Sequence, residues 1–182
     1  MALLRSFDPV VQENCRVLIL GSMPGVASLR QQQYYAHPRN AFWPIMQELL
    51  DIERGSDYDE RCTRLTDCGL AVWDVLKTCN RVGSLDSSIE TATEQANDFV
   101  RLFSAHRSIR CVYFNGGTAE RLYKKHVLCQ KEIYSCELRY QKLPSTSPAY
   151  AAMRFDEKLE QWRRILVEVD EGDGRSTDKT KG

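Results

Sequence analysis

Several features that often reveal a protein's class are missing from this sequence. No run approaches the roughly 18 uninterrupted apolar residues of a membrane span, and the first residues hold no apolar stretch of signal-peptide length. The formal net charge is zero, with 25 basic against 25 acidic residues, so the overall charge does not indicate a nucleic-acid partner. We therefore expect a cytoplasmic protein, or a nuclear one in a eukaryote, without a membrane partner.

Paired cysteines and nucleotide-binding signatures are also absent. The seven cysteines are an odd number and none stands in a C-x-x-C pair, which argues against a zinc site or an iron–sulfur cluster and favours reduced thiols. The segment GSMPG, residues 21–25, lacks both the lysine of a phosphate-binding loop and the G-x-G-x-x-G spacing. These glycines are thus equally compatible with a phosphate cradle and with an ordinary tight turn.

The sequence does contain an alternation of apolar strands and amphipathic helices. Its 182 residues, 42% of them hydrophobic, suit one domain with a single core. Apolar runs predict strands at residues 15–21, 70–76, 109–117 and 137–144. Helical periodicity predicts helices at residues 42–52, 91–106, 118–128 and 155–169. This order predicts an α/β protein with a mostly parallel sheet, a single domain over residues 1–170 and a disordered tail at 171–182.

Unusual polar residues follow the predicted strands, where ligands bind in a parallel α/β sheet. Asp74 ends a strand and is either a ligand-accepting carboxylate or a partly exposed strand-end residue. His37 is either an acid–base group or a residue that holds its loop by hydrogen bonds. The loop LPSTSPAYA, residues 143–151, has a turn composition that also suits phosphate contacts.

Asn40 presents two alternatives of its own. Asparagine is a favoured N-cap, and the helix predicted after it has Pro44 near its first turn, where proline is tolerated. Local pattern alone favours the cap. The alternative is that the side-chain amide takes part in chemistry.

Five ordered segments together resemble one family. LILGSMPG, YYAHPRNAFW, WDVL with RVGSLDSSI, YFNGG and LPSTSPA lie within about residues 16–162. They resemble the uracil-DNA glycosylase superfamily, most closely its hypoxanthine-DNA glycosylase branch, the DNA-deoxyinosine glycosylases. The resemblance implies a three-layer α/β/α fold with a central four-stranded, mostly parallel sheet. It also implies a monofunctional enzyme, without metal or cofactor, that cleaves the N-glycosidic bond of a deaminated base flipped out of DNA.

The resemblance assigns the catalytic role to Asn40. Many relatives place an aspartate or asparagine two residues after the first glycine of the first motif, to position the attacking water. Met23 stands there in this chain, and a thioether cannot hold a water for attack. In the hypoxanthine branch the asparagine of the HPxN segment is held responsible, and it corresponds to Asn40. Because an amide is a weak base, we expect slow turnover.

Base-binding residues follow by position in the same motifs. Tyr35 would stack on the extruded base, Asp74, as an ionised carboxylate, would accept its ring N–H, and Asn115 would add donors. The first-motif residues Gly21, Ser22 and Met23 would complete the pocket.

The motif after the fourth strand implies DNA contacts. Its residues Ser145, Thr146, Ser147 and Pro148 would grip the DNA backbone. Relatives then carry a leucine wedge that fills the space left by the flipped base, whereas this chain has Ala149. Tyr150 or Met153 would fill that space, or the wedge is absent.

We therefore expect a monomer that acts on DNA in base excision repair, with hypoxanthine as first substrate and uracil or xanthine as further ones. One alternative is a uracil-DNA glycosylase specific for G·U or G·T mismatches. Another is a catalytically inactive lesion-binding module, which the methionine at position 23 suggests.

Overall fold

The computed structural model describes residues 3–134 and 137–170, and a sheet of four parallel strands forms its centre. The order across the sheet is β3 (Leu70–Asp74), β2 (Val17–Gly21), β6 (Cys111–Asn115) and β7 (Arg139–Leu143). All three neighbouring pairs are parallel, so the four carboxyl ends meet at one edge. The predicted α/β class with a central four-stranded parallel sheet is confirmed.

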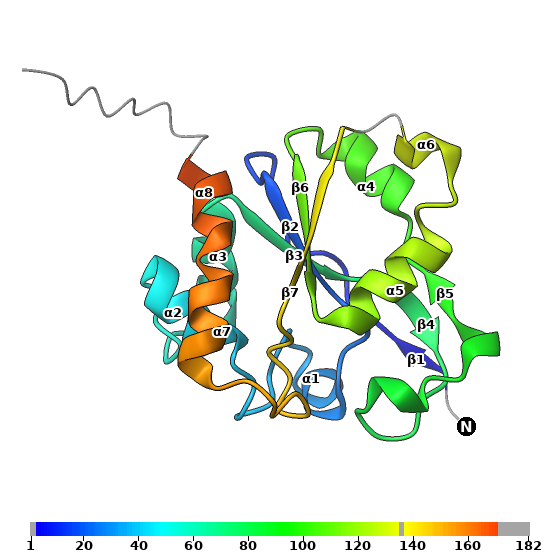
Figure 1. The fold of residues 1–182 in the computed structure, drawn as a ribbon, viewed down its shortest axis with the longest axis horizontal. Helices are drawn as coiled ribbons and strands as arrows, with labels where there is room; N and C mark the ends of the chain where they lie inside the picture. The colour runs from blue at the N-terminus through cyan, green and yellow to red at the C-terminus, as the bar shows by residue number, and fades with distance from the viewer. Residues whose placement is uncertain (1–2, 135–136, 171–182) are drawn as a thin grey trace, which may run out of the picture.

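Helices cover both faces of this sheet. Figure 1 shows α2 (Phe42–Leu50), α3 (Tyr58–Asp67), α7 (Phe155–Trp162) and α8 (Arg164–Asp170) on one side. On the other side lie α4 (Phe99–Ala105), α5 (Gly117–His126) and α6 (Lys131–Tyr134). The short α1 (Val26–Gln31) follows β2 near the edge where the strands end. The expected three layers are therefore present.

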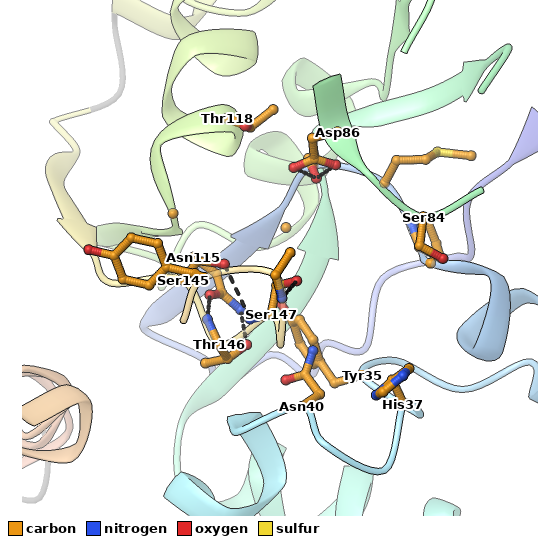
Figure 2. Close-up of a pocket in the computed structure, with 18 of the residues that line it drawn as sticks. Tyr35, His37, Asn40, Ser84, Asp86, Asn115, Thr118, Ser145, Thr146 and Ser147 are labelled. Atoms are coloured by element: carbon orange, nitrogen blue, oxygen red, sulfur yellow. Dashed lines mark hydrogen bonds between the residues drawn. The ribbon is translucent and has the colours of Figure 1, made fainter. Parts of the chain in front are cut away.

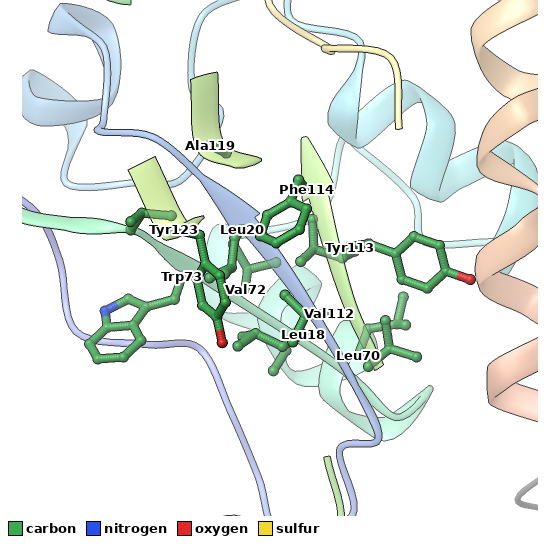
Figure 3. Close-up of a cluster of buried hydrophobic side chains, with 14 of the residues drawn as sticks. Leu18, Leu20, Leu70, Val72, Trp73, Val112, Tyr113, Phe114, Ala119 and Tyr123 are labelled. Atoms are coloured by element: carbon green, nitrogen blue, oxygen red, sulfur yellow. The ribbon is translucent and has the colours of Figure 1, made fainter. Parts of the chain in front are cut away.

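The core explains why the strands read as continuous apolar runs. Every residue of β2 and β3 is buried, as a strand covered on both faces must be. Successive residues of β6 face opposite layers: Phe114 lies 5.2 Å from Tyr123 of α5, measured between ring centroids, whereas the Tyr113 hydroxyl donates to the carbonyl of Arg164 in α8. Figure 3 shows these side chains packed with Leu18 and Leu20.

A second, smaller sheet was not predicted. It contains β1 (Leu4–Arg5), β4 (Leu76–Cys79) and β5 (Gln95–Ala96), paired antiparallel in the order β1-β4-β5. A single residue, Val75, separates β4 from β3. The amide of Val75 donates to the carbonyl of Gly21, so the chain that leaves the central sheet stays bound to its edge.

The helix predicted over residues 91–106 is wrong in its first half. Residues Thr91–Thr93 form a 3-10 turn and β5 follows, so that α4 begins only after Asp98, whose side chain caps it. The physical reason is Asn97, which is buried and donates from Nδ2 to the carbonyl of Asp74 over 2.8 Å. That tertiary bond holds the chain extended where the local pattern favours a helix.

Two further differences concern helix ends and a polar helix. The helix expected at residues 155–169 is divided at Arg163 into α7 and α8. The sequence analysis missed α3, because its sequence YDERCTRLTD is mostly polar and it buries only Leu65 and Thr66.

The six cysteines among the described residues form no disulfide with one another, and Cys15 and Cys111 are buried, as is usual for small apolar side chains. In residues 3–134 and 137–170 we find no helix of the length and apolarity that crossing a membrane requires. The tail predicted at 171–182 lies outside the described residues.

Candidate active site

A cavity of about 650 Å³ opens at the edge where the four parallel strands end. Its wall contains the residues predicted for catalysis and base binding, namely Gly21, Ser22, Met23, Tyr35, Asn40, Asp74 and Asn115. Figure 2 shows Tyr35, His37 and Asn40 on one side of it and Asp86 across from them. The loop of residues 145–150 also lines the cavity, whereas Met153 is not part of its wall.

The loop after β2 is held in place by a buried arginine and an aspartate. The guanidinium of Arg81, whose side chain is fully buried, donates to the carbonyls of Met23 and Pro24. It also lies 3.8 Å from the carboxylate of Asp86, which accepts 2.8 Å hydrogen bonds from the Ser22 hydroxyl. These contacts give GSMPG a defined shape, and Met23 itself is 5% exposed.

Gly21 and Asp74 approach so closely that only glycine fits at position 21. A Cβ atom on Gly21 would lie 2.3 Å from Oδ1 of Asp74. The two residues are register partners in neighbouring strands, which puts the carboxyl group directly beside the end of β2. The Asp74 side chain is therefore held against the backbone of Gly21, which is part of the cavity wall.

Asp74 is buried without an ionic partner among the described residues. It is 3% exposed, and its Oδ2 has no hydrogen-bond partner there. Burial raises the pKa of Asp74 to about 8, Asp86 adds to the rise and Arg81 opposes it. This direction favours the neutral acid, whereas the sequence analysis expected an ionised carboxylate.

Tyr35 provides a flat wall. Its ring stacks on Phe42 with the centroids 4.0 Å apart and the planes 23° from parallel, and its opposite face is therefore the one available to a planar ligand. The backbone φ of Tyr35 is +56°, a left-handed conformation that is uncommon for a tyrosine. The hydroxyl is buried beside the side chain of Asn115; burial raises its pKa, and the interaction with Asn115 opposes the rise.

Asn40 stands just before α2 and lines the cavity at the same time. Its Oδ1 accepts a 3.0 Å hydrogen bond from the backbone amide of Phe42, the first residue of α2, but the N-cap position itself is Ala41, so the predicted N-cap is displaced by one residue. The backbone amide of Asn40 donates to the backbone carbonyl of His37, and this bond closes the turn that contains His37. One lone pair of Oδ1 and the side-chain NH₂ group remain for a ligand or a water.

Asn115 is bound to the loop after β7 by both ends of its amide. Its Oδ1 accepts from the amide of Thr146 and its Nδ2 donates to Oγ1 of Thr146, each over 2.8 Å (Figure 2). The carbonyl of Thr146 in turn accepts from the amide of Ala41. One N–H and one lone pair of Oδ1 remain, close to the Tyr35 hydroxyl, so much of the capacity of Asn115 serves to position the loop.

The loop of residues 145–150 is organised by its own hydroxyls. Ser145 Oγ accepts from the amide of Ser147, and Ser147 Oγ accepts from the amide of Ala149. Tyr150, 39% exposed, follows, and its carbonyl accepts a 2.9 Å bond from the buried Nζ of Lys158. The same Nζ lies 5.2 Å from the centroid of the Tyr150 ring.

This geometry agrees with comparisons with known proteins. Residues 9–168 match the family model described as the uracil DNA glycosylase superfamily. The chain belongs to this superfamily. Two proteins named Hypoxanthine DNA glycosylase are similar to it, from Methanosarcina barkeri with 37% identity over 62% of this chain and 70% of that protein, and from Methanosarcina acetivorans with 38% over 63% and 72%.

A solved structure extends the similarity of this superfamily member to the whole fold. The solution NMR structure of a uracil DNA glycosylase candidate from Methanosarcina acetivorans matches with a TM-score of 0.76 and 30% identity. The match covers 93% of this chain and 99% of that one. Superfamily glycosylases hydrolyse N-glycosidic bonds, so the chain is placed among DNA glycosylases.

Among the polar residues that the sequence analysis did not single out are Arg81 and Asp86, which shape the first loop, and Thr118 and Arg121. Asp86, Thr118 and Arg121 line the cavity of this glycosylase, whereas Arg81 does not. Arg81 and Asp86 lie in the segment RVGSLDSSI, but the residues that they bind are about 60 positions away in the sequence. Among the described residues no group of three or more His, Cys, Asp or Glu side chains is arranged to hold a metal ion.

Proposed function

We propose that this superfamily member is a monofunctional DNA glycosylase of base excision repair that removes hypoxanthine from DNA, with uracil or xanthine as further substrates. The observation that carries the proposal is the single cavity that brings Asn40, Tyr35 and Asp74 together. The two relatives named Hypoxanthine DNA glycosylase support hypoxanthine as the first choice.

Asn40 has the position and chemistry to hold the attacking water. Departure of the base leaves an oxocarbenium-like sugar, a strong electrophile that a weakly activated water can attack. The free lone pair of Asn40 Oδ1 accepts from that water, while the bond to the Phe42 amide keeps the side chain still. Asn40 would therefore bind the first backbone amide of α2 and hold the attacking water at the same time.

The remaining wall would bind the base and the strand. A flipped base would stack on the free face of Tyr35 and meet Asp74 with its polar edge. Residues Ser145–Pro148 would contact the DNA backbone through the hydroxyls and amides that their own turns leave free. We propose Tyr150 as the wedge rather than Met153, because Tyr150 lines the cavity and Met153 does not.

The decisive test is release of a base from defined DNA. Duplexes with one deoxyinosine, deoxyuridine, deoxyxanthosine or thymidine opposite each normal base are incubated with the protein and then treated with alkali, which cleaves abasic sites. We expect strand cleavage at deoxyinosine first, unchanged by EDTA. Cleavage at uracil alone would establish the mismatch-specific alternative, which the candidate uracil DNA glycosylase among the neighbours favours.

A serine at position 40 separates catalysis from helix capping. Asn40→Ser keeps a capping oxygen for the Phe42 amide but shortens the side chain, so stability is expected to hold while cleavage falls by about a hundredfold or more. Asn14→Ala is the control. The side chain of Asn14 donates to the backbone carbonyl of Thr66 at the amino ends of the strands, away from the cavity. If the wild type binds the lesion duplex without cleaving it, and Asn40→Ser binds it with the same affinity, the result would support the inactive lesion-binding module.

Quaternary state and domain extent belong to the same proposal. We propose that residues 1–170 form one domain that works as a monomer on DNA. Light scattering of the protein alone and bound to a lesion duplex tests this, and a 1:1 complex with one protein is the expected result.

A further inference from the structure

The carboxyl group of Asp74 is the most deeply buried acid of the cavity wall. We propose that Asp74 acts as a neutral carboxylic acid, whose O–H donates to the carbonyl oxygen of the flipped base while its C=O accepts the adjacent ring N–H. The inference rests on the proposed glycosylase function and specifies which chemical edge the pocket recognises.

The position of Asp74 leaves one oxygen of its carboxyl group without a hydrogen bond. Oδ2 is buried and has no hydrogen-bond partner in residues 3–134 and 137–170, and Oδ1 lies against Gly21, which has no side chain. The carbonyl of Asp74 is bound by Asn97, so the backbone cannot move away. An ionised carboxylate in such a place would lose its hydration without compensation, whereas a neutral acid has a much smaller penalty.

The charged and titratable groups around Asp74 do not supply that compensation. Tyr34 and Tyr35 face it from the loop after α1, and Cys79 from β4, and all are neutral at pH 7. Asp86 adds a further negative charge. Arg81 is the nearby cation, but its guanidinium is bound to the carbonyls of Met23, Pro24 and Gly83 and pairs with Asp86.

The electrostatic balance agrees with this geometry. Burial, the largest cause, and the negative charge of Asp86 together raise the pKa of Asp74 to about 8, in spite of the opposing charge of Arg81. At pH 7 the acid form therefore predominates before any base enters the cavity.

A neutral acid is complementary to one particular base edge. Hypoxanthine, xanthine and uracil each present a carbonyl next to a ring N–H, and a carboxylic acid pairs with that edge through two coplanar hydrogen bonds. An ionised carboxylate would accept the N–H but would repel the carbonyl oxygen. The acid form thus suits the oxo bases produced by deamination.

The donated hydrogen bond would also assist departure of the base. When the glycosidic bond breaks, the base takes the electron pair, and part of the negative charge resides on its carbonyl oxygens. A donor already aimed at one of those oxygens stabilises the charge as it develops. The proton remains on Asp74 throughout, so no further acid is required.

The first experiment measures single-turnover cleavage of a deoxyinosine duplex from pH 6 to 10 with the full chain. The wild type is expected to lose activity about tenfold per pH unit above about pH 8. Asp74→Asn keeps one donor and one acceptor but has no titrating proton, so it is expected to cleave at a lower rate without this decline. An alkaline decline common to both proteins would come from the substrate and would overturn the proposal.

The second experiment observes the carboxyl group directly and does not depend on activity. The protein is labelled with ¹³C at aspartate carboxyl carbons, and the Asp74 signal is assigned by its loss in Asp74→Asn. A titration midpoint well above the ordinary aspartate range, near 8, supports the proposal, whereas a midpoint near 4 overturns it.

The substrate itself provides the third arm. Deoxynebularine carries a purine that lacks both the 6-carbonyl and the N1–H, and we expect its release at least about tenfold slower than that of hypoxanthine. Equal release would overturn the proposed edge recognition. If no deaminated base is released at any pH, the proposed function fails, and the NMR titration still decides the state of Asp74 by itself.

Discussion

Asn115 at the end of β6 and Thr146 in the loop after β7 are joined by two hydrogen bonds of 2.8 Å. Thr146 is 1% exposed, so these bonds are shielded from water. Because the Thr146 carbonyl also accepts from the backbone amide of Ala41, the same contact sets the distance between the loop of residues 145–150 and the start of α2. The position of Asn40 relative to the loop thus depends on a residue that need not touch the DNA.

Replacement of Asn115 should therefore weaken DNA binding and catalysis together. Asn115→Ala leaves the Thr146 amide without an acceptor, at a cost of about 1–3 kcal/mol. We expect a higher KM for a deoxyinosine duplex, a lower kcat and a lower melting temperature. Thr146→Val keeps the hydrogen bond from the backbone amide of residue 146 to Asn115 Oδ1 and loses only the bond to Oγ1, so it should have a smaller effect. Equal losses in the two variants would show that the loop is held in another way.

A methyl group at position 21 should disable base binding. In Gly21→Ala the new Cβ would lie 2.3 Å from Asp74 Oδ1, so Asp74 or the strand end must shift. We expect at least a tenfold loss of kcat/KM on deoxyinosine DNA. Gly55→Ala is the matched control, since nothing lies within 4 Å of a Cβ there. Wild-type kinetics in Gly21→Ala would mean that Asp74 is not needed where the structure places it.

Arg81 should be important for folding although it is not expected to touch the substrate. Arg81→Met leaves the carbonyls of Met23 and Pro24 without their donor and the Asp86 charge unpaired, which should cost about 3 kcal/mol of unfolding free energy. Urea unfolding measures the loss. Arg107→Met, at an exposed position, is expected to change it by less than about 0.5 kcal/mol.

The raised pKa of Asp74 predicts how stability depends on pH. A carboxyl group whose pKa is about 8 when folded binds a proton that the unfolded chain releases near pH 4, so the wild type loses stability as pH rises between these values. Asp74→Asn removes this dependence. Its stability relative to the wild type should therefore increase by at least about 1 kcal/mol from pH 5 to 8 and then level off. Urea unfolding at pH 5, 7 and 9 gives the comparison, and a constant difference would argue against a raised pKa.

Tyr150 should support base flipping, with Lys158 as the residue that positions it. Tyr150→Ala is expected to reduce the fluorescence increase of 2-aminopurine placed beside a deoxyinosine, most strongly when the lesion is well paired. Lys158→Met should reduce it too, because the Tyr150 carbonyl and ring both lose their contact with Nζ. Met153→Ala is the comparison; a larger effect there would make Met153 the wedge.

Local patterns were sufficient for the central sheet and for one contact of the site. The strands of residues 17–21 and 70–74 are buried on both faces, so they had to be apolar throughout and could be recognised. The hydrogen bond from the Phe42 amide to Asn40 Oδ1 spans two residues, so local pattern could predict it, although the N-cap of α2 is Ala41 rather than Asn40. By contrast, α3 was missed because it covers the core with only two residues.

What the sequence by itself determined is the four strands of the central sheet and the edge at which polar residues gather, because the burial of a strand is visible in a few neighbouring residues. Only the tertiary structure decided the burial that raises the pKa of Asp74, the pairing of Asn115 with Thr146 and the contacts of Arg81. A pKa or a hydrogen-bond partner depends on groups that are distant along the chain and close in space, such as Asp74 beside Gly21 and Arg81 beneath Met23. Those distances exist only once the chain has folded.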